Sequence, residues 1–391
     1  MNRPFIPLSR PWLSPAVHAK IGEVLESGRL SGDGPVCRSV EDRIRRLFGI
    51  RHALLTSSCT HALEMAAAML GLRRGDEVVM PSFTFVSTAN AVLRAGGKPV
   101  FCEINDRTLT LDPTDVERRV TPRTKAIIAV HYAGVAAEME AIRQIALARN
   151  IAVIEDAAQG VNARYRGVPL GTIGDMGAFS FHDTKNYTSG EGGAFLTNDG
   201  ELSRKGEIFR EKGTNRANFL RGQVDKYTWV DEGSSFILSD VLAAILAVQL
   251  DELEPIQEGR RRVHELYMEG FRDLEQQGVV RLPVIPPDRQ SNYHIFYLLV
   301  ENEATRDMLI HRLKECGIGS AFHYVPLHSA PYARRMLDTA DLDLPVTDRT
   351  FRTLIRLPIY PQLGSSEVGY VVESVVNVLK PVRKSRPVPG R

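Results

Sequence analysis

One lysine in the middle of the chain has neighbours that suit it to covalent chemistry. Lys185 lies in the polar, glycine-bearing stretch FHDTKNYTSGEGG, between two apolar segments. Desolvation lowers the pKa of a lysine, and the neutral amine can then form a reversible imine with an aldehyde. Ser180 comes five residues earlier, and the glycines of GEGG permit close approach of the backbone to a ligand. An isolated lysine is usually a solvated surface group, so the prediction depends on these partners.

A carboxylate ends an apolar run in the string VIEDAAQG. Asp156 is this carboxylate, and Gln159 follows three residues later. A carboxylate at the end of a buried strand is costly unless it has a partner. It could meet a protonated pyridine nitrogen and so keep an aromatic ring able to accept electrons. An ordinary helix cap after the strand is the alternative, and for a single aspartate it is the more common role.

A third polar segment, LTSSCTHALEMA, leads from a strand end into a helix. Backbone N–H groups at the helix N-terminus, with the hydroxyls of Ser57, Ser58 and Thr60, form an anion site that suits a phosphate. Ordinary N-capping needs only one of these hydroxyls and remains an alternative. A phosphate site, an acid for a ring nitrogen and a reactive lysine together predict that pyridoxal 5'-phosphate is the cofactor.

The elements that position these groups alternate between short apolar runs and helical patterns from Arg51 to Thr197. Four runs predict buried strands of a mainly parallel sheet, namely EVVMPSF, KPVFCEI, KAIIAVHY and IAVIEDAA. Between them, two segments with helical spacing end at Gly71 and Asn150, namely THALEMAAAMLGL and EMEAIRQIALARN. The pattern predicts an α/β fold, in which ligands bind beyond the carboxyl ends of the strands.

The last third of the chain predicts a second, smaller unit. The apolar helix LSDVLAAILAVQLDEL breaks at Pro255, a charged helix follows, and SNYHIFYLLV alternates like a strand. We predict a large cofactor-binding α/β domain over residues 1–255, which includes the N-terminal segment. A smaller C-terminal α+β domain with its connecting helix is predicted over residues 256–380, and a flexible tail over residues 381–391.

Composition excludes several classes of protein. The 49 Lys and Arg residues nearly balance the 47 Asp and Glu residues, and a net charge of +2 gives no reason to expect binding to nucleic acid or to an anionic membrane. No segment approaches the ~20 apolar residues that span a bilayer, and we expect a cytoplasmic protein. The four cysteines have neither zinc-ligand nor disulfide spacing, so no metal site is predicted.

The order of these groups and the strings around them resemble the DegT/DnrJ/EryC1/StrS family of sugar aminotransferases. The strings close to family sequences are SGDGP, PSFTFVSTANA, EDAAQG, FSFHDTKNYTSGEGG and HYVPLH. The resemblance extends from about Pro7 to Leu379, nearly the whole chain. It implies the type I aspartate-aminotransferase-like fold of pyridoxal-phosphate-dependent enzymes, with a mainly parallel central sheet and a smaller C-terminal α+β domain.

The resemblance implies roles for the residues around the cofactor ring. It implies a Schiff base between the cofactor and Lys185, a contact of Asp156 with the pyridine nitrogen, and a place for Gln159 near the ring. It also implies that Phe85, in PSFTFVSTANA, stacks on the ring. Phe83 and Phe85 are otherwise expected to be core aromatics, and only the resemblance favours Phe85.

At the phosphate, the resemblance implies Thr60, Ser180 and the backbone of Cys59. Two departures from the family pattern occur there. The family usually has glycine where Cys59 stands, so the backbone must suit a side chain. The family also commonly sends an asparagine of a GYNYR-like string from the neighbouring subunit, whereas this chain reads GSSFI and has Ser235 at that position. A hydroxyl can still bond a phosphate oxygen.

Within the family, REKGTNR, FLRGQVDKYTW and GSSF resemble the subgroup of dTDP-4-amino-4,6-dideoxygalactose transaminases. The implied reaction moves an amino group from L-glutamate to C4 of dTDP-4-keto-6-deoxy-D-glucose. Its products are dTDP-4-amino-4,6-dideoxy-D-galactose and 2-oxoglutarate. An aminotransferase for another nucleotide-linked keto sugar, either 3-keto or GDP-linked, is one alternative. A non-catalytic regulator that binds the cofactor is another, because a fold alone does not establish activity.

The resemblance also implies a homodimer with shared active sites and two groups of candidate substrate residues. The string FHYVPLH supplies residues for the sugar nucleotide or the dimer seam: His323, Tyr324 and His328. Lone histidines are more often structural. The segment that begins at FREKGTNR supplies cations for the diphosphate or the glutamate carboxylates: Arg210, Lys212, Arg216 and Arg221. Ordinary surface solvation is the alternative for these cations.

Overall fold

The computed structural model describes residues 4–337 and 339–379. The tail predicted over residues 381–391 lies outside the described residues. Seven strands form the central sheet: β1 (His52–Thr56), β2 (Glu77–Pro81), β3 (Lys98–Cys102), β4 (Thr124–Val130), β5 (Ala152–Asp156), β8 (Met176–Ser180) and β9 (Gly193–Thr197). Their order is β1-β9-β8-β5-β4-β2-β3, and β9 is antiparallel to both of its neighbours while the other pairs are parallel. The predicted mainly parallel sheet is therefore confirmed.

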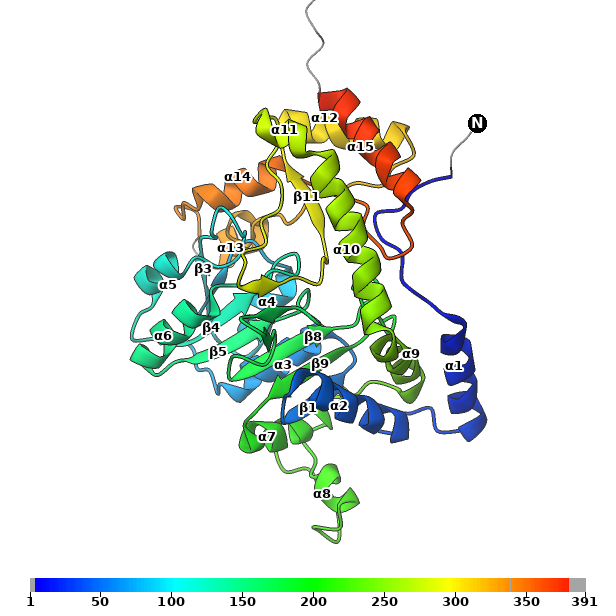
Figure 1. Cartoon of the computed structure of the whole chain (residues 1–391). Helices are drawn as coiled ribbons and strands as arrows, with labels where there is room; N and C mark the ends of the chain where they lie inside the picture. Colours follow the sequence, from blue (N-terminus) through cyan, green and yellow to red (C-terminus); the bar gives the residue numbers. More distant parts are fainter. Residues whose placement is uncertain (1–3, 338, 380–391) are drawn as a thin grey trace, which may run out of the picture.

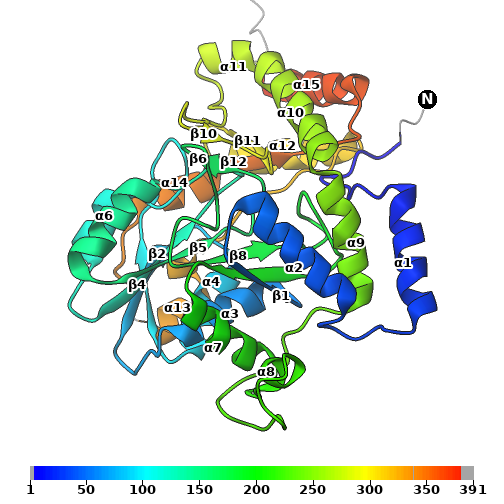
Figure 2. The ribbon, with the colours of Figure 1, turned by 60° about the horizontal axis from the view of Figure 1, so that its bottom comes forward.

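Helices cover both faces of this sheet and give the molecule three layers (Figures 1 and 2). One face packs against α2 (Pro35–Phe48), α5 (Pro113–Arg119), α6 (Met139–Arg149) and α9 (Asp240–Asp251). The other packs against α3 (Cys59–Met69), α4 (Val86–Arg94) and α7 (Gly200–Arg210). Val79 of β2 faces the first core, whereas Val78 and Met80 face the second. Burial on both faces explains why the strands read as continuous apolar runs.

Two helix ends follow the capping signals in the sequence. Ser58 caps the N-terminus of α3, where its hydroxyl accepts the N–H of His61 at 3.1 Å. Asn150 ends α6 in the left-handed conformation, with φ of 52°. α1 (Pro15–Ser27) lies outside α9 (Figure 2).

The helix break predicted at Pro255 falls three residues earlier. Glu252 is both the C-cap of α9 and the N-cap of α10 (Leu253–Gly270). Pro255 lies in the first turn of α10, where the missing N–H removes no intrahelical hydrogen bond. A proline in the first turn starts a helix, and the prediction mistook this proline for a stop.

A separate hydrophobic core, which we call the C-terminal core, lies under the C-terminal part of the chain. Its two-stranded antiparallel sheet consists of β11 (Phe296–Leu299) and β12 (Leu354–Leu357). Four helices belong to the same part: α11 (Arg272–Gln276), α12 (Glu303–Glu315), α14 (Pro345–Thr353) and α15 (Ser365–Leu379). α10 runs from the central sheet to this part (Figure 1). It contributes Ile256 to the first core of the central sheet and Tyr267 to the C-terminal core. The division at residue 255 stays a prediction.

The strand expected over SNYHIFYLLV is shorter than predicted, because its first half is irregular. Tyr293 has φ of +55°, which no strand contains. The carbonyls of Tyr293 and His294 accept hydrogen bonds from Arg260 instead of from a strand, at 3.0 and 2.6 Å.

The N-terminal segment joins the C-terminal core. Ile6 pairs with Ile318 in a parallel bridge, and its N–H donates to the carbonyl of Gly317 at 2.9 Å. The side chain of Ile6 is buried in the C-terminal core.

The smaller elements of the chain are β6 (Arg164–Tyr165), β7 (Val168–Pro169), β10 (Arg289–Gln290), α8 (Arg216–Leu220), η1 (Leu327–Ser329) and α13 (Pro331–Met336).

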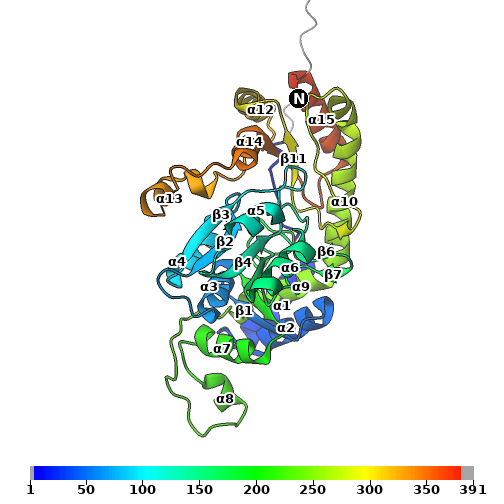
Figure 3. The ribbon, with the colours of Figure 1, turned by 90° about the vertical axis from the view of Figure 1, so that its left-hand side faces the viewer.

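The segment of residues 211–236, which contains α8, projects from the body of the molecule (Figures 1 and 3). It carries five exposed apolar or aromatic side chains: Phe219, Leu220, Tyr227, Trp229 and Val230. Within residues 4–337 and 339–379, no helix has both the length and the apolar character needed to cross a membrane.

Candidate active site

A cavity of about 640 Å³ lies between the carboxyl ends of the central strands and the C-terminal part. This size suits a small-molecule ligand. Seven of the predicted cofactor residues line it: Cys59, Thr60, Phe85, Asp156, Gln159, Ser180 and Lys185. They come from separate parts of the sequence, and the parallel strands bring them to one edge of the sheet.

Lys185 lies in the connection between β8 and β9. Its backbone N–H donates to the carbonyl of His182 at 2.9 Å and closes a turn. Its amine has no hydrogen-bond or ion-pair partner among residues 4–337 and 339–379. Burial lowers the pKa of Lys185, and the positive charge of Arg356 lowers it further. The lysine is therefore a free amine aimed at a ligand rather than a solvated cation.

Asp156 ends β5 with its carboxylate buried. The hydroxyl of Thr88 donates to Oδ2 at 2.8 Å, and the N–H of Ala158 donates to Oδ1 at 3.2 Å. Thr88 is held in turn by the hydroxyl of Thr84, at 2.9 Å. In the described part of the chain no cation forms an ion pair with this carboxylate, and burial raises its pKa. A buried acid that lacks a cation fits the protonated nitrogen of a pyridine ring.

The hydroxyls before α3 divide between capping and the cavity. Ser58 caps the helix, and the hydroxyl of Ser57 bonds Nδ1 of His61 at 2.8 Å. Thr60 faces the cavity, where its hydroxyl lies 2.8 Å from that of Ser87. Capping therefore leaves Thr60 and the first N–H groups of α3 available for an anion.

The cysteine at the expected glycine position causes no strain. Cys59 is the first residue of α3, and the α conformation accepts a side chain. The close approach of backbone to backbone occurs instead at Gly193, where an added Cβ would lie 2.5 Å from the amide nitrogen of Cys59. The glycine that this site requires is therefore the last one of GEGG.

The two phenylalanines of PSFTF have different environments. Phe83 is 1% exposed and packs against Tyr132 and Tyr324, so it is a core residue. Phe85 is 56% exposed and faces the cavity. Its exposed face is open to stacking on a ligand ring, as the resemblance implies.

Gln159 connects the sheet to the opposite wall of the cavity. Its Oε1 accepts the N–H of Ala133 at 2.7 Å, and its Nε2 donates to the hydroxyl of Tyr324 at 2.9 Å. The ring of Tyr324 stacks on His323, with centroids 3.5 Å apart. Burial lowers the pKa of His323 to about 2, so this imidazole is neutral. Tyr324 and His323 both line the cavity, whereas His328 does not.

His328 is buried elsewhere. Its Nδ1 lies 2.7 Å from the hydroxyl of Ser82, and its Nε2 lies 3.6 Å from Asp348. Its backbone N–H also donates to the Ser82 hydroxyl, at 3.0 Å. These contacts join the C-terminal segment to the end of β2.

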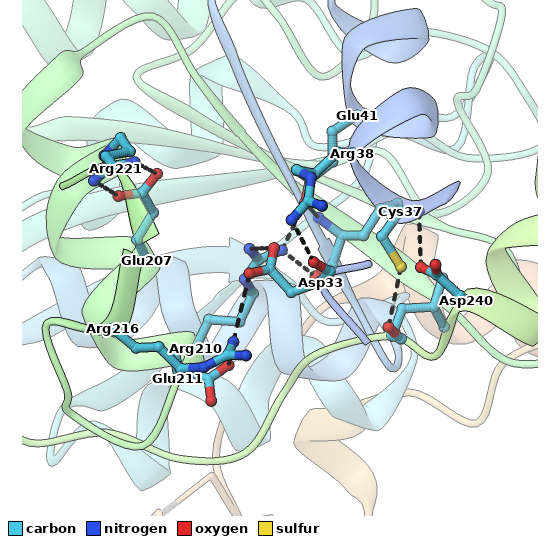
Figure 4. Close-up of polar contacts among 12 residues, drawn as sticks. Asp33, Cys37, Arg38, Glu41, Glu207, Arg210, Glu211, Arg216, Arg221 and Asp240 are labelled. Carbon is cyan, nitrogen blue, oxygen red and sulfur yellow. Dashed lines mark hydrogen bonds and ion pairs between the residues drawn. The ribbon is translucent and has the colours of Figure 1, made fainter. Parts of the chain in front are cut away.

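The predicted cations at the end of α7 and in the projecting segment do not line the cavity, and Figure 4 shows their polar contacts. Arg210 is buried, and its guanidinium donates to Glu41 at 2.7 Å and to the carbonyl of Leu55 at 2.8 Å. It also lies 3.4 Å from Asp33, which Arg216 approaches at 3.7 Å. We call Arg210, Glu41, Asp33 and Arg216 the paired cluster.

The remaining candidates on this segment pair locally. Arg221 forms a bidentate ion pair with Glu207, at 2.9 and 2.8 Å. Lys212 donates to Glu211 at 2.9 Å. Ser235 forms a backbone bridge with Glu211 and does not line the cavity.

Sequence reasoning missed several residues of the cavity. Thr88, which does not line the cavity but donates to Asp156, also carries a signal, because it belongs to the quoted string PSFTFVSTANA. Arg260, His294 and Arg356 carry no local signal, because they lie in the C-terminal part and reach the cavity only through the tertiary fold.

In the part of the chain that the structure describes, an amine without a hydrogen-bond partner, a buried acid without an ion pair and a helix N-terminus beside a threonine meet in one cavity. On a mainly parallel α/β sheet, this combination defines a pyridoxal-phosphate-dependent aminotransferase of the type I fold.

The comparisons with known proteins agree. The model of the DegT/DnrJ/EryC1/StrS aminotransferase family matches residues 13–376. The spore coat polysaccharide biosynthesis protein SpsC of Bacillus subtilis (strain 168) is 34% identical over 384 residues, which cover 96% of this chain and 97% of SpsC. This chain belongs to the DegT/DnrJ/EryC1/StrS aminotransferase family and is a pyridoxal-phosphate-dependent sugar aminotransferase.

Two solved structures are similar over nearly their whole length. DesV of S. venezuelae, solved in complex with a ketimine intermediate, has a TM-score of 0.88 and 32% identity, over 97% of this chain and 100% of DesV. Spr1654 of Streptococcus pneumoniae in its PLP form has a TM-score of 0.87 and 26% identity, over 97% of this chain and 99% of Spr1654. Spr1654 has also been solved in a PMP form.

Proposed function

We propose that this protein transfers an amino group from L-glutamate to C4 of dTDP-4-keto-6-deoxy-D-glucose. The products are dTDP-4-amino-4,6-dideoxy-D-galactose and 2-oxoglutarate. The observation that carries amino-group transfer is the single cavity that joins the free amine of Lys185, the buried acid Asp156 and the N-terminus of α3. The choice of sugar rests on the strings REKGTNR, FLRGQVDKYTW and GSSF in residues 210–236.

In the proposed reaction, each cavity residue has one task. Bound pyridoxal phosphate supplies a ring that takes up the electron pair left at the α-carbon of the amino acid. Asp156 keeps the ring nitrogen protonated, and Thr88 orients this carboxylate. With the cofactor bound, Lys185 would hold it through its amine and, as a free amine, would act as the base that takes the proton from the α-carbon of the amino acid. The same residues run the second half in reverse with the keto sugar, so we expect ping-pong kinetics.

The phosphate and the ring face are held by other residues. Thr60, Ser180 and the first N–H groups of α3 line the cavity where they would hold the phosphate, and Phe85 would lie against the ring. Tyr324, positioned by Gln159, borders the space for the sugar.

We also propose a homodimer in which the projecting segment of residues 211–236 reaches the partner subunit. Its exposed aromatic side chains support this, because monomers rarely expose such a group. In this arrangement Ser235 serves the phosphate of the partner, and Lys212 and Arg221 remain candidates for contacts with the substrate across the seam, whereas the buried His328 does not. Sedimentation combined with an activity assay tests the proposal, and a fully active monomer would disprove it.

The substrate is tested with purified keto-sugar nucleotides and L-glutamate, followed by identification of the product by NMR. We expect turnover of the dTDP-linked 4-keto sugar and an axial 4-amino group in the product. Turnover of only a GDP-linked or 3-keto sugar would reject the proposed substrate and leave amino-group transfer intact. The polysaccharide pathway named for SpsC is consistent with a nucleotide-sugar substrate.

A further inference from the structure

His294, on the cavity wall that the C-terminal part supplies, has one ring nitrogen bonded and the other free. Its Nδ1 lies 2.8 Å from Oδ1 of Asn186, while Nε2 has no hydrogen-bond or ion-pair partner within residues 4–337 and 339–379. The residue is only 9% exposed and lines the cavity. A buried polar atom normally has a partner, so a free ring nitrogen on the wall of a cavity indicates that a ligand supplies it.

The bonds of Asn186 decide which nitrogen of this imidazole carries the proton. The side-chain amide of Asn186 donates to the carbonyl of Asn292 at 2.7 Å, so its oxygen faces His294. An amide oxygen only accepts, and Nδ1 of His294 therefore carries the proton. Burial lowers the pKa of His294 well below its usual value, so the ring is neutral. Nε2 is then an acceptor, and the ligand group that it binds must be a donor.

The main chain around His294 is held at several points. Asn292 donates from its side chain to the carbonyl of Gln159 at 2.9 Å. Arg260 donates to the carbonyls of Tyr293 and His294. Tyr293 has the left-handed backbone conformation, which is strained for a side chain of this size and persists where the surroundings hold it, as they often do at ligand sites. The imidazole therefore has a fixed place on the wall.

His294 also lies close to the reacting centre of the proposed function. Asn186, which bonds the imidazole, follows Lys185 directly in the chain. The charge of Lys185 reaches the ring, since it adds to the effect of burial and lowers the pKa of His294 further. The reacting carbon of each substrate must come to Lys185. A donor on an atom next to that carbon is therefore in the neighbourhood of Nε2.

Only one of the two proposed substrates has a hydroxyl beside its reacting carbon. Next to the α-carbon, L-glutamate has its reacting amine, a carboxylate and a methylene group, and the last two donate no hydrogen bond at neutral pH. The 4-keto-6-deoxy sugar has a hydroxyl on C3, on one side of C4. On the other side, C5 carries the ring oxygen and a methyl group. The C3 hydroxyl is thus the donor that suits Nε2.

We propose that Nε2 of His294 accepts a hydrogen bond from the C3 hydroxyl of the keto-sugar nucleotide, and that Asn186 positions the imidazole for this contact. The inference rests on the proposed aminotransferase function and specifies how the sugar is aligned. The contact orients the sugar ring with C4 towards Lys185. It also selects against a 3-deoxy sugar, because such a ligand leaves the buried acceptor without a partner.

The test separates the two nitrogens of the ring. His294→Asn keeps a donor near the place of Nδ1 and removes the acceptor at Nε2, whereas His294→Gln retains an amide oxygen near the place of Nε2. We expect kcat/KM for the keto-sugar nucleotide to fall about 5- to 100-fold in His294→Asn, because the buried hydroxyl loses its acceptor. His294→Gln should recover part of this loss.

Each half-reaction is measured separately, by single-turnover absorbance changes of the holoenzyme. In His294→Asn the rate with L-glutamate should change less than about twofold, since glutamate does not use Nε2. The same sugar nucleotide without its C3 hydroxyl supplies a second comparison. The wild type should discriminate against this 3-deoxy analogue by about 5- to 100-fold, and His294→Asn should abolish most of the difference.

His264→Asn is the matched control. His264 is another buried histidine, and burial lowers its pKa to about 4. It packs against Tyr293 and Phe296 and does not line the cavity. Both half-reactions of the folded control should keep their wild-type rates. If His294→Asn does not fold, His294→Phe serves, since a phenyl ring keeps the ring shape without the acceptor and should show the same selective loss with the sugar.

Three results would overturn the inference. The first is an equal slowing of both half-reactions in His294→Asn, which would assign the imidazole to Lys185. The second is a wild type that turns over the 3-deoxy analogue as well as the parent sugar. The third is a wild type that accepts only 3-keto sugars, which have no C3 hydroxyl, and this result leaves amino-group transfer intact. The proposed function itself fails, and the inference with it, if the wild-type holoenzyme aminates no keto-sugar nucleotide with L-glutamate.

Discussion

The paired cluster around Arg210 and the cavity around Lys185 treat buried charge in opposite ways. In the paired cluster, Arg210 meets Glu41 and Asp33, and the charges balance within the chain (Figure 4). In the cavity, neither Lys185 nor Arg356 forms an ion pair with an acid, and Asp156 forms none with a cation, within the described residues 4–337 and 339–379. Both regions contain residues that the sequence marks as candidates. Their charge balance separates a structural role from a chemical one.

The difference predicts opposite effects of mutation. Removing a charge from the paired cluster leaves its partner buried and alone, which destabilises the fold. Removing a charge from the cavity relieves the apo protein of an uncompensated group and harms only ligand binding and catalysis. Four experiments test this distinction.

The largest effect is expected for Lys185→Ala. The variant lacks the amine that binds the cofactor and moves the proton, so kcat should fall by at least about 10³-fold, within the range of general acid–base catalysis alone. Steady-state kinetics measure the loss, and absorbance shows whether the cofactor is still attached. Denaturant unfolding of the apo protein should show no loss of stability, and wild-type turnover by the variant would refute the assignment.

Arg210→Met should produce the largest loss of stability. The substitution leaves Glu41 buried next to the main chain of Leu55 without its cation, and the free energy of unfolding should fall by about 3–5 kcal/mol. Urea denaturation measures the change. The folded fraction should keep the wild-type KM for both substrates. A stable variant with a raised KM would show instead that Arg210 belongs to a substrate site.

Asp156→Asn should weaken the cofactor and strengthen the apo fold. Burial raises the pKa of Asp156, so the native state favours the protonated acid, and the stability that this group contributes at low pH is lost as pH rises through the raised pKa. The asparagine has no ionised form, so the apo variant should be more stable than the wild type at neutral pH. The gap should close in acid.

Cofactor titration of the same variant supplies the second half of this prediction. Affinity for pyridoxal phosphate should fall, because the ring nitrogen loses its ionic partner. An apo variant less stable than the wild type at neutral pH would indicate that Asp156 has a structural role instead.

The smallest effect concerns pH. The charge of Arg356 lowers the pKa of Lys185, so Arg356→Met should raise it. The neutral lysine attaches the cofactor, and the pH midpoint of cofactor attachment should therefore move upward in the variant. A pH series of absorbance spectra measures the midpoint. Arg352 on α14 is exposed and does not line the cavity, so Arg352→Met should leave the midpoint in place.

The sheet and most of the cofactor site were within reach of the sequence. Continuous apolar runs marked β2, β3, β4 and β5, and the polar residues after them marked the cavity, because parallel strands end at one edge. The string FSFHDTKNYTSGEGG named Lys185 and the glycine that contacts the backbone of Cys59.

The rest depends on contacts between distant segments. Nothing near Arg356 in the string IRLPIYP reveals that β12 faces Lys185. Arg210 and Arg356 are equally plausible ligands by residue type, and only the positions of Glu41 and Asp33 separate them. The sequence alone does not show whether a proline ends one helix or lies in the first turn of the next, and Pro255 lies in the first turn of α10.

The pairing of Ile6 with Ile318 imposes an order on folding. Ile6 cannot find this neighbour until Ile318 has been synthesised. Leu8 and Ser9, just after Ile6, border the cavity where Lys185 lies. A substitution at Leu8 or Ser9 would thus alter the cavity as well as the segment that holds Ile6 against the C-terminal part.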